Sequence, residues 1–529
     1  MDRRPNILFA FADDWGRYAS IYRSFQAENS LNNLIDTPNF DRIATEGSLF
    51  LNAYVPAPSC TPCRSSILSG SYFWETGLGA ILRGAVWDEE IPTYPLILEE
   101  NGYHIGYTYK VWSPGKAINA PYGGERTRYE AFGSDFNQFS HVVTEMSKNM
   151  GIDEAKKILL EETVENFKSF LSDRPNGNPF CYWWGPTNTH RTWERGSGKH
   201  LWGIDPDSLT GRLPEFLPDV HEIREDVADY LGECLAFDAG LGKIIETLEE
   251  SGELDNTLIV ISGDHGIPGI PRAKCNLYDI GTEVALAVRW PEKIRPGRVV
   301  DDFVNLMDLA PTFLEVADVQ PPASMSAKSL MNVLTSNQSV GQIDPDRDWV
   351  VTGRERHVEN ARSGGLPYPM RAIRTKDFLY IRNFKPDRWP MGDPKGLDDL
   401  TVDAPKWEEI STDTRCAYGD LDASPTKAWM IHNRADHHVT DSFELAFGKR
   451  SLEELYDVQN DPDLMINLAE DSAFNDIRVE LASKLDEILI ENNDPRLCET
   501  NCRFENAPFA GPLSDHYISL SDSTNYFGA

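Results

Sequence analysis

The sequence lacks any run of about 18 uncharged apolar residues, the length that a membrane-spanning helix needs. We therefore expect no membrane-spanning segment. The first residues, MDRRPNILFAFADDWG, place basic side chains before an apolar run as a secretory leader does, but the run ends early at Asp13-Asp14 and no cleavage site follows. We interpret this segment as a buried strand and expect a cytoplasmic protein, or a periplasmic or secreted one if a leader had been removed.

Cysteine and positive charge are also scarce in the 529 residues. Eight cysteines are too few for a disulfide scaffold, and although Cys498 and Cys502 lie close enough in sequence to pair, a bridge across so short a loop is disfavoured. The 50 Lys and Arg against 84 Asp and Glu give a formal net charge of −34, which repels nucleic acid and anionic membrane surfaces. We expect no nucleic-acid partner, and an anionic substrate would need a locally cationic pocket.

Short apolar runs alternate with helical patterns along residues 1–365. This alternation is typical of an α/β domain in which a large, mostly parallel sheet is covered by helices on both faces. Apolar residues recur with the helical period in residues 226–250, and a second helix is expected in residues 153–171. The expected strands are Asn6 to Phe11, Tyr103 to Tyr109, Phe180 to Trp184, Thr257 to Ser262 and Val284 to Val288.

The pattern changes near residue 366. Beyond it come a strand-like segment at 378–384, a long polar stretch rich in Pro and Asp, and a helical segment at 472–491. We expect residues 366–529 to form a smaller α+β domain that completes the substrate pocket.

Polar side chains follow four of the expected strands. Asp13-Asp14 follows the first, Lys110 the second, His190 the third and Asp264-His265 the fourth. Because ligands of open α/β sheets bind beyond the carboxyl ends of the strands, we expect these four groups to meet at one edge of the sheet.

The paired acids are candidate metal ligands. Adjacent carboxylates such as Asp13 and Asp14 repel each other unless a cation or several donors neutralise them. Alternatively, one of the two caps a helix while the other faces solvent. Asp264 and His265 repeat the arrangement on a glycine-flanked turn. Three carboxylates with one imidazole favour Ca²⁺ or Mg²⁺, and the His ligand leaves Mn²⁺ or Zn²⁺ open.

Residues 60–64 read Cys-Thr-Pro-Cys-Arg and are followed by Leu-Ser-Gly at 68–70. The Cys-x-x-Cys spacing alone would suggest a redox pair, but such a pair is expected to open a helix in a small βαβ domain. The segment matches the C-x-P-x-R signature of the sulfatase family better, and PNILFAFADDWG, TPNFDRIATEG, SGDHGIP and ELYDVQNDPDLMINLA also look like sulfatase segments. Over most of its length the chain therefore resembles the formylglycine-dependent sulfatases of the alkaline-phosphatase-like superfamily.

Within this family the sequence is similar to the heparan N-sulfatase (sulfamidase) branch. The similarity rests on residues 274–278 after GDHGIP, on Tyr-Pro-Met-Arg at 368–371 and on Thr-His-Arg at 189–191. Two positions depart from the family pattern. Trp112 stands where many sulfatases have a His, so the residue that removes the hydrate's proton is undefined. His265 stands where relatives often have Asn, which leaves the identity of the metal open.

The resemblance implies that Cys60 is converted to formylglycine by a formylglycine-generating enzyme or an anaerobic sulfatase-maturating enzyme. One hydroxyl of the aldehyde hydrate would attack sulfur, and the second would lose its proton as sulfate departs and the aldehyde re-forms. A divalent metal, Ca²⁺ first, would polarise the sulfate. Its ligands would be Asp13, Asp14, Asp264 and His265.

Four further residues take roles by their position in the family pattern. Arg64 would orient the hydrate, and Lys110 and Lys274 would hold sulfate oxygens as these gain charge. His190 would protonate the leaving group, because imidazole can donate a proton near neutral pH. Each of these residues taken alone is more often an ordinary polar side chain, so the roles depend on the resemblance.

Substrate contacts are expected near the domain boundary. Arg354, His357 and Arg371 would line a pocket for an anionic sugar, or are surface charges. We expect a sulfatase that acts on a sulfated carbohydrate, with an O-sulfate ester favoured. Three alternatives stay open: an N-sulfoglucosamine sulfohydrolase, a phosphonate or phosphate ester hydrolase of the same superfamily, and a catalytically silent glycan-binding protein.

Overall fold

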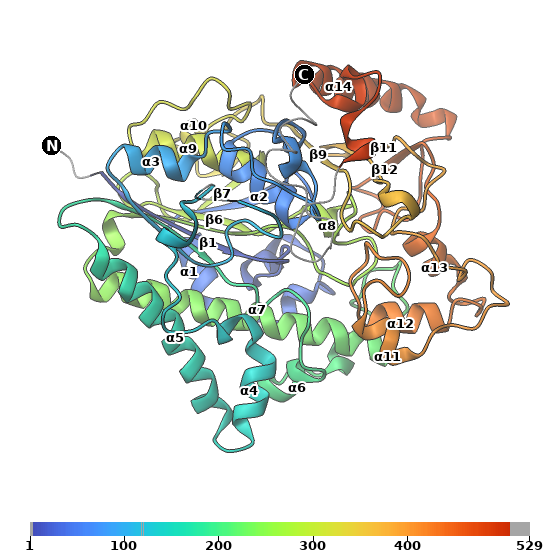
Figure 1. Cartoon of the computed structure of the whole chain (residues 1–529), viewed down its shortest axis with the longest axis horizontal. Coiled ribbons are helices and arrows are strands. Elements are labelled where there is room, and N and C mark those ends of the chain that lie inside the picture. Colours follow the sequence, from blue (N-terminus) through green and yellow to red (C-terminus); the bar gives the residue numbers. More distant parts are fainter. Residues whose placement is uncertain (1–3, 118, 120, 508–529) are drawn as a thin grey trace.

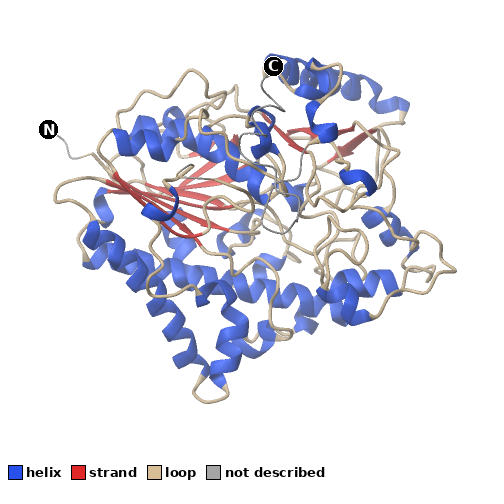
Figure 2. Cartoon of the chain, in the orientation of Figure 1, coloured by secondary structure: helices blue, strands red, loops and turns tan. Residues whose placement is uncertain are grey.

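The computed structural model describes residues 4–117, 119 and 121–507, so residues 508–529 of the expected second domain lie outside the described residues. Within the described part, the chain forms an eight-stranded sheet and a separate four-stranded sheet (Figure 1). Helices cover both faces of the larger sheet (Figure 2). The large, mostly parallel sheet with a smaller second unit confirms the predicted fold class.

The larger sheet has the order β3-β4-β1-β5-β6-β2-β7-β8. Strand β6 runs antiparallel to both of its neighbours, and the other pairs are parallel. In chain order the strands are β1 (Asn6–Ala12), β2 (Ser48–Tyr54), β3 (His104–Tyr109), β4 (Phe180–Gly185), β5 (Thr257–Gly263), β6 (Leu286–Arg289), β7 (Arg298–Asn305) and β8 (Val340–Gly341).

The central strand β1 explains why this sheet is buried on both faces. All seven of its residues are buried, and successive side chains point to opposite sides. Ile7, Phe9 and Phe11 join one core with α2 (Cys60–Ser69), α3 (Tyr94–Glu100) and α9 (Leu309–Val316). Leu8 and Ala10 join the opposite core with α1 (Pro38–Glu46), α5 (Ile152–Asp173) and α7 (His221–Glu250). A strand buried on both faces is apolar at nearly every position, and in β1 only Asn6 is polar.

The smaller sheet is antiparallel, with the order β12-β11-β10-β9. Its strands are β9 (Trp349–Arg354), β10 (Met370–Thr375), β11 (Phe378–Asn383) and β12 (Glu453–Asp457). Ile373 and Tyr380 pack on one face against Leu485 of α14 (Asn475–Glu491). Because β9 precedes residue 366, this sheet takes strands from both sides of the expected domain boundary.

A long insertion between β11 and β12 carries α11 (Trp407–Thr412), α12 (Pro425–His432) and α13 (Thr440–Phe447). It returns to the larger unit, where the Thr426 hydroxyl of α12 donates a hydrogen bond of 2.6 Å to Asp226 of α7. Figure 1 shows α12 beside the end of α7. The insertion therefore lies against the helical layer of the larger sheet.

Three expectations about the chain can be compared with the fold. All eight cysteines are free thiols, so Cys498 and Cys502 do not pair. Among the described residues, no helix combines the length and apolarity needed to cross a membrane. The five expected strands of the larger sheet correspond to β1, β3, β4, β5 and β6, and the strand-like segment at 378–384 corresponds to β11, whereas β2, β7 and β8 were not expected.

Candidate active site

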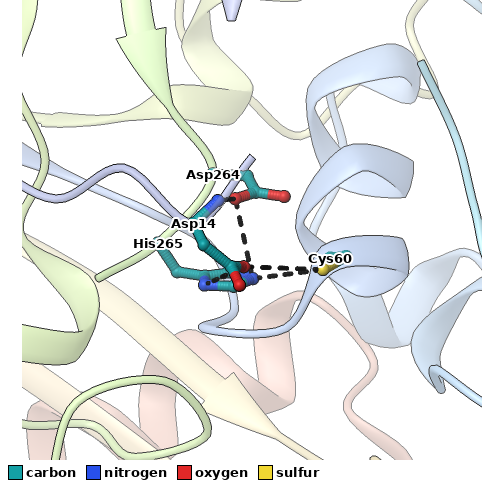
Figure 3. A group of neighbouring side chains, drawn as sticks. All are labelled: Asp14, Cys60, Asp264 and His265. Carbon is teal, nitrogen blue, oxygen red and sulfur yellow. Dashed lines mark hydrogen bonds and ion pairs between the residues drawn. The ribbon is translucent and has the colours of Figure 1, made fainter. Parts of the chain in front are cut away.

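The four polar groups lie at one edge of the larger sheet, as the strand-end argument predicts. Strands β3, β4, β1 and β5 are adjacent and parallel, so their carboxyl ends meet. Lys110, Asp13 and Asp264 each follow their strand directly, and His190 lies in the loop after β4. Helix α2 begins at the same edge, with Cys60 facing Asp14 and His265 (Figure 3).

Cys60 is a buried thiol at the start of α2, with 2% of its surface exposed. Its Sγ lies 3.4 Å from His265 Nε2 and 3.9 Å from Asp14 Oδ1. Burial, together with the charge of Asp13, raises the pKa of the Cys60 thiol well above its ordinary value. A thiol that stays protonated is a poor nucleophile.

Arg64, one turn along α2, joins two carboxylates from different strands. Its Nε donates to Asp264 Oδ2 and one terminal nitrogen donates to Asp13 Oδ1, both at 2.9 Å. The other terminal nitrogen donates to the carbonyls of Lys110 and Val111. The guanidinium is fully buried, so its contacts lie with the acids of the site. Arg64 therefore holds the two carboxylates in place, and its predicted role in orienting the hydrate stays a prediction.

Asp13 and Asp14 point to different partners. Asp14 has a left-handed backbone with a φ of 59°, a conformation that is costly for a residue other than glycine and is common at functional sites. Both oxygens of Asp13 accept hydrogen bonds of 2.7 Å from Lys110 Nζ. Burial alone would raise the pKa of Asp13, but Lys110 and Arg64 hold it well below its ordinary value. Asp13 is therefore a stable anion.

Lys274 links Asp14 to the insertion. Its Nζ donates to Asp14 Oδ2 at 2.8 Å and lies 3.2 Å from Asp422 Oδ2. Burial disfavours the ammonium, but Asp14 and Asp422 raise the pKa of Lys274 well above its ordinary value. The two lysines that were expected to hold sulfate thus flank the start of α2 as charged groups.

Two overlapping sets of side chains fit a divalent cation. Asp14, Asp264, His265 and residue 60 offer ligand atoms that all lie within 4.8 Å of one another, and Asp13, Asp14 and His190 form a second set that shares Asp14. The Asp14 amide also donates to Asp264 Oδ1 at 2.6 Å. Buried carboxylate oxygens with one imidazole suit a hard or borderline divalent ion. The structure therefore brings together the four predicted metal ligands, three in one set and Asp13 in the other.

His190 is partly exposed at the solvent side of the cluster. Its Nδ1 donates a hydrogen bond to the Arg191 carbonyl, so Nε2 is the nitrogen that faces Asp14. Nε2 lies 3.8 Å from Asp14 Oδ2, and 36% of the side chain is exposed. This partly exposed position suits a general acid, because the leaving group of a bound substrate would lie on the solvent side of the site.

The three residues expected to contact substrate occupy different places. His357 Nδ1 lies 2.8 Å from the hydroxyl of Ser59, next to Cys60, and burial lowers the pKa of His357 to about 3. Arg354 is buried and pairs with Asp420 at 3.0 Å. Arg371 is fully buried and is neutralised by two carboxylates, so the structure does not bring it to the cluster. Those carboxylates are Glu355 and Asp494.

The sequence analysis did not identify Asp422, which lies in the acid-rich insertion where no spacing marks one acid among many. Trp183 and Trp184 of β4 are fully buried in the two cores, so neither is placed to stack on a sugar. Trp112, at the departure from the family pattern, donates its indole N–H to Ser65 at 2.8 Å. A separate cleft of about 1030 Å³ between the two sheets, lined by residues such as Asn52, shares no residue with the catalytic cluster.

Comparisons with known proteins agree with this geometry. The chain is 26% identical to the N-sulphoglucosamine sulphohydrolase of Homo sapiens over 519 residues, which cover 94% of this chain and 92% of that protein. It is 23% identical to an ulvan-active sulfatase of Formosa agariphila over 517 residues, which cover 93% and 76% of the two chains. The fold is similar to a solved structure of a protein bound to its substrate D-glucosamine-2-N,6-O-disulfate, with a TM-score of 0.58, 19% identity, and coverage of 94% and 100%.

Two family models match the sequence. The model described as N-sulphoglucosamine sulphohydrolase, C-terminal, matches residues 272–413. The model described as Sulfatase matches residues 5–319, which is more than half of the chain and includes Cys60, Arg64 and the four candidate metal ligands. The chain therefore belongs to the sulfatase family.

Proposed function

We propose that this chain hydrolyses sulfate from a sulfated carbohydrate, with O-sulfate esters as the favoured substrates, after Cys60 has been converted to formylglycine. The observation that carries the proposal is the position of Cys60: it begins a helix, is buried, and belongs to a candidate metal-binding set next to acids that pair with Lys110 and Lys274. Similarity to an N-sulphoglucosamine sulphohydrolase and to an ulvan-active sulfatase supports a carbohydrate substrate.

The chain's own side chains can supply binding and proton transfer. When formed, the aldehyde hydrate at residue 60 would supply an oxygen nucleophile in place of the protonated thiol. Lys110 Nζ and Lys274 Nζ would hold the sulfate oxygens. Both ammonium groups are charged, and they donate hydrogen bonds to Asp13 and Asp14, two acids of the site. His190 would donate a proton from Nε2 to the leaving oxygen.

The metal proposed for this site is Ca²⁺, with Mg²⁺ or Mn²⁺ as further candidates. Asp13, Asp14, Asp264 and His265 would hold it, and a bound cation would polarise the sulfate oxygens. Oxygen ligands from three buried acids favour the hard ions, and the imidazole keeps Mn²⁺ among them.

A maturing enzyme is the proposed protein partner. Because Cys60 is 2% exposed in the folded chain, such an enzyme would have to reach it before folding is complete. Conversion in a host that produces a maturing enzyme lowers the mass of the peptide that contains Cys60, because sulfur is replaced by oxygen and hydrogen is lost.

The test compares matured protein with a Cys60→Ala variant on 4-nitrocatechol sulfate and on 4-nitrophenyl phosphate. We expect sulfate release by the matured protein, none by the variant, and slower phosphate release. Dominant phosphate release would favour the phosphoester hydrolase instead. Confirmed conversion together with sugar binding and no sulfate release would favour the glycan-binding protein.

A further inference from the structure

Asp422 differs from the other acids of the catalytic cluster in its exposure. The side chains of Asp13, Asp14 and Asp264 are at most 1% exposed, whereas that of Asp422 is 19% exposed. Asp422 belongs to neither set of candidate metal ligands. Lys274 Nζ contacts Asp14 on one side and Asp422 on the other, so Asp422 stands on the solvent side of a sulfate-binding lysine.

The segment that carries Asp422 is fixed on both sides. Two residues before it, Asp420 pairs with Arg354 at 3.0 Å and with Arg362 at 2.8 Å. Two residues after it, the Ser424 hydroxyl donates to the Gly269 carbonyl at 2.7 Å. A carboxylate held in this way is pre-organised, since it needs no rearrangement to meet a ligand.

The charge of Lys274 keeps Asp422 ionised. Burial would raise the pKa of the Asp422 carboxyl group, but the Lys274 ammonium, 3.2 Å away, holds that pKa well below the usual range. An ionised carboxylate accepts hydrogen bonds and donates none. It attracts a hydroxyl or amino group placed beside it and repels a second anion.

We propose that Asp422 contacts the substrate beside the scissile sulfate, accepts a hydrogen bond from a neighbouring hydroxyl or amino group, and excludes a second sulfate there. This inference rests on the proposed function. A sulfate held by Lys110 and Lys274 leaves the sugar on the solvent side of the cluster, where His190 and Asp422 are partly exposed. The substrate class is therefore a sugar whose sulfated position has an unsulfated neighbour.

The competing explanation is that Asp422 only neutralises Lys274. That role predicts that removal of the carboxylate changes the turnover of all sulfate esters alike. Contact with the substrate predicts instead that removal changes the ratio between esters that differ beside the scissile bond. A ratio measured within one enzyme preparation also cancels differences in folding and in the fraction of converted Cys60.

The experiment measures kcat/KM for sulfate release by matured protein on catechol monosulfate, which has a free hydroxyl beside the sulfate, and on catechol bis-sulfate. In the wild type we expect the monosulfate to be preferred at least tenfold. In Asp422→Asn we expect this preference to shrink by about tenfold or more, because the repelling charge is gone. Asp413→Asn is the matched control, since it removes the same charge from an exposed position of the same insertion.

A preference that is the same in Asp422→Asn as in the wild type, within twofold, would overturn the inference. So would an equal shift in Asp413→Asn. If Asp422→Asn does not fold, Asp422→Ser carries the same test, because it also removes the charge and leaves a small polar side chain at this position. Absence of sulfate release from both esters by matured wild type would count against the proposed function itself, so the two failures are distinguishable.

Discussion

Arg64 provides the sharpest test of how the catalytic cluster is held together. Replacing it with Met removes the pairs to Asp13 and Asp264 and the hydrogen bonds to two carbonyls. Lys110 still neutralises Asp13, so the uncompensated charge falls mainly on Asp264, which is fully buried. Breaking a buried ion pair by removing one partner costs about 3–5 kcal/mol.

That cost translates into a measurable change in melting temperature. An unfolding entropy of about 2.1 cal/mol/K per residue gives about 1.1 kcal/mol/K for 529 residues, if the chain unfolds in one transition. We therefore expect Arg64→Met to melt about 3–5 °C below the wild type, in EDTA so that no cation offsets the lost charge. Arg64→Lys keeps the charge but cannot reach both carboxylates, so its melting temperature should fall between the two.

Arg126→Met is the matched control for this measurement. Arg126 pairs with Glu99 on the surface, where the two side chains are 49% and 35% exposed. Exposed pairs contribute about 0–1 kcal/mol, so its melting temperature should fall by less than about 1 °C. If Arg64→Met melted as close to the wild type as this control, the conclusion that Arg64 stabilises the carboxylates of the site would be wrong.

Three further predictions concern the proton donor, the metal and a buried acid of α7. His190→Ala should lower turnover of sugar sulfates by about 10²–10⁴-fold but that of 4-nitrophenyl sulfate much less, because this leaving group needs no proton; equal losses would contradict the general-acid role. Adding Ca²⁺ after EDTA should raise the melting temperature, and Asp14→Asn should reduce the rise, unless the ion binds elsewhere. Burial raises the pKa of Glu233 to about 7, above the unfolded value near 4.3, so folding takes up a proton and stability falls as pH rises between these values. Wild type should therefore melt at a higher temperature at pH 5.5 than at pH 7.5, and Glu233→Gln should make this difference in melting temperature smaller. If the difference is unchanged in Glu233→Gln, other titrating groups cause it.

The strands that could be predicted from the sequence are those buried on both faces. Strand β1 is apolar at nearly every position because two cores enclose it. Strand β7 lies near the edge of the sheet and contains Asp301 and Asp302, which interrupt the apolar pattern. Asp302 is nevertheless fully buried, because it accepts hydrogen bonds from the amides of Ile343 and Asp344. Strand β7 could not be predicted from the apolar pattern, because the groups that allow Asp302 to be buried come from a segment about 40 residues away.

Dependence on partners from distant segments also decides which residues of the site could be predicted from the sequence. Asp13, Lys110 and Asp264 could be predicted because each follows a strand directly, and parallel neighbours bring such positions together. The role of a buried Arg or Lys side chain could not be predicted in this way, because it depends on which acids pack against that side chain in the folded chain. Arg371 forms ion pairs with Glu355 and Asp494, residues that lie 16 and 123 positions away in the chain, and is therefore not available to a substrate.

Lys274 and Asp422 show why the insertion matters for function. Lys274 stands among the motifs of the larger unit, yet the acid on its solvent side comes from a segment that differs in composition and carries no motif. The segment is fixed by Asp420 and Ser424, so the position of Asp422 follows from long-range folding and not from local pattern. Motifs near the strands therefore identify the reaction, and the insertion supplies the side chain that meets the rest of the substrate. Substrate preference in this chain should accordingly change with substitutions near residue 422 while the chemistry at residue 60 persists.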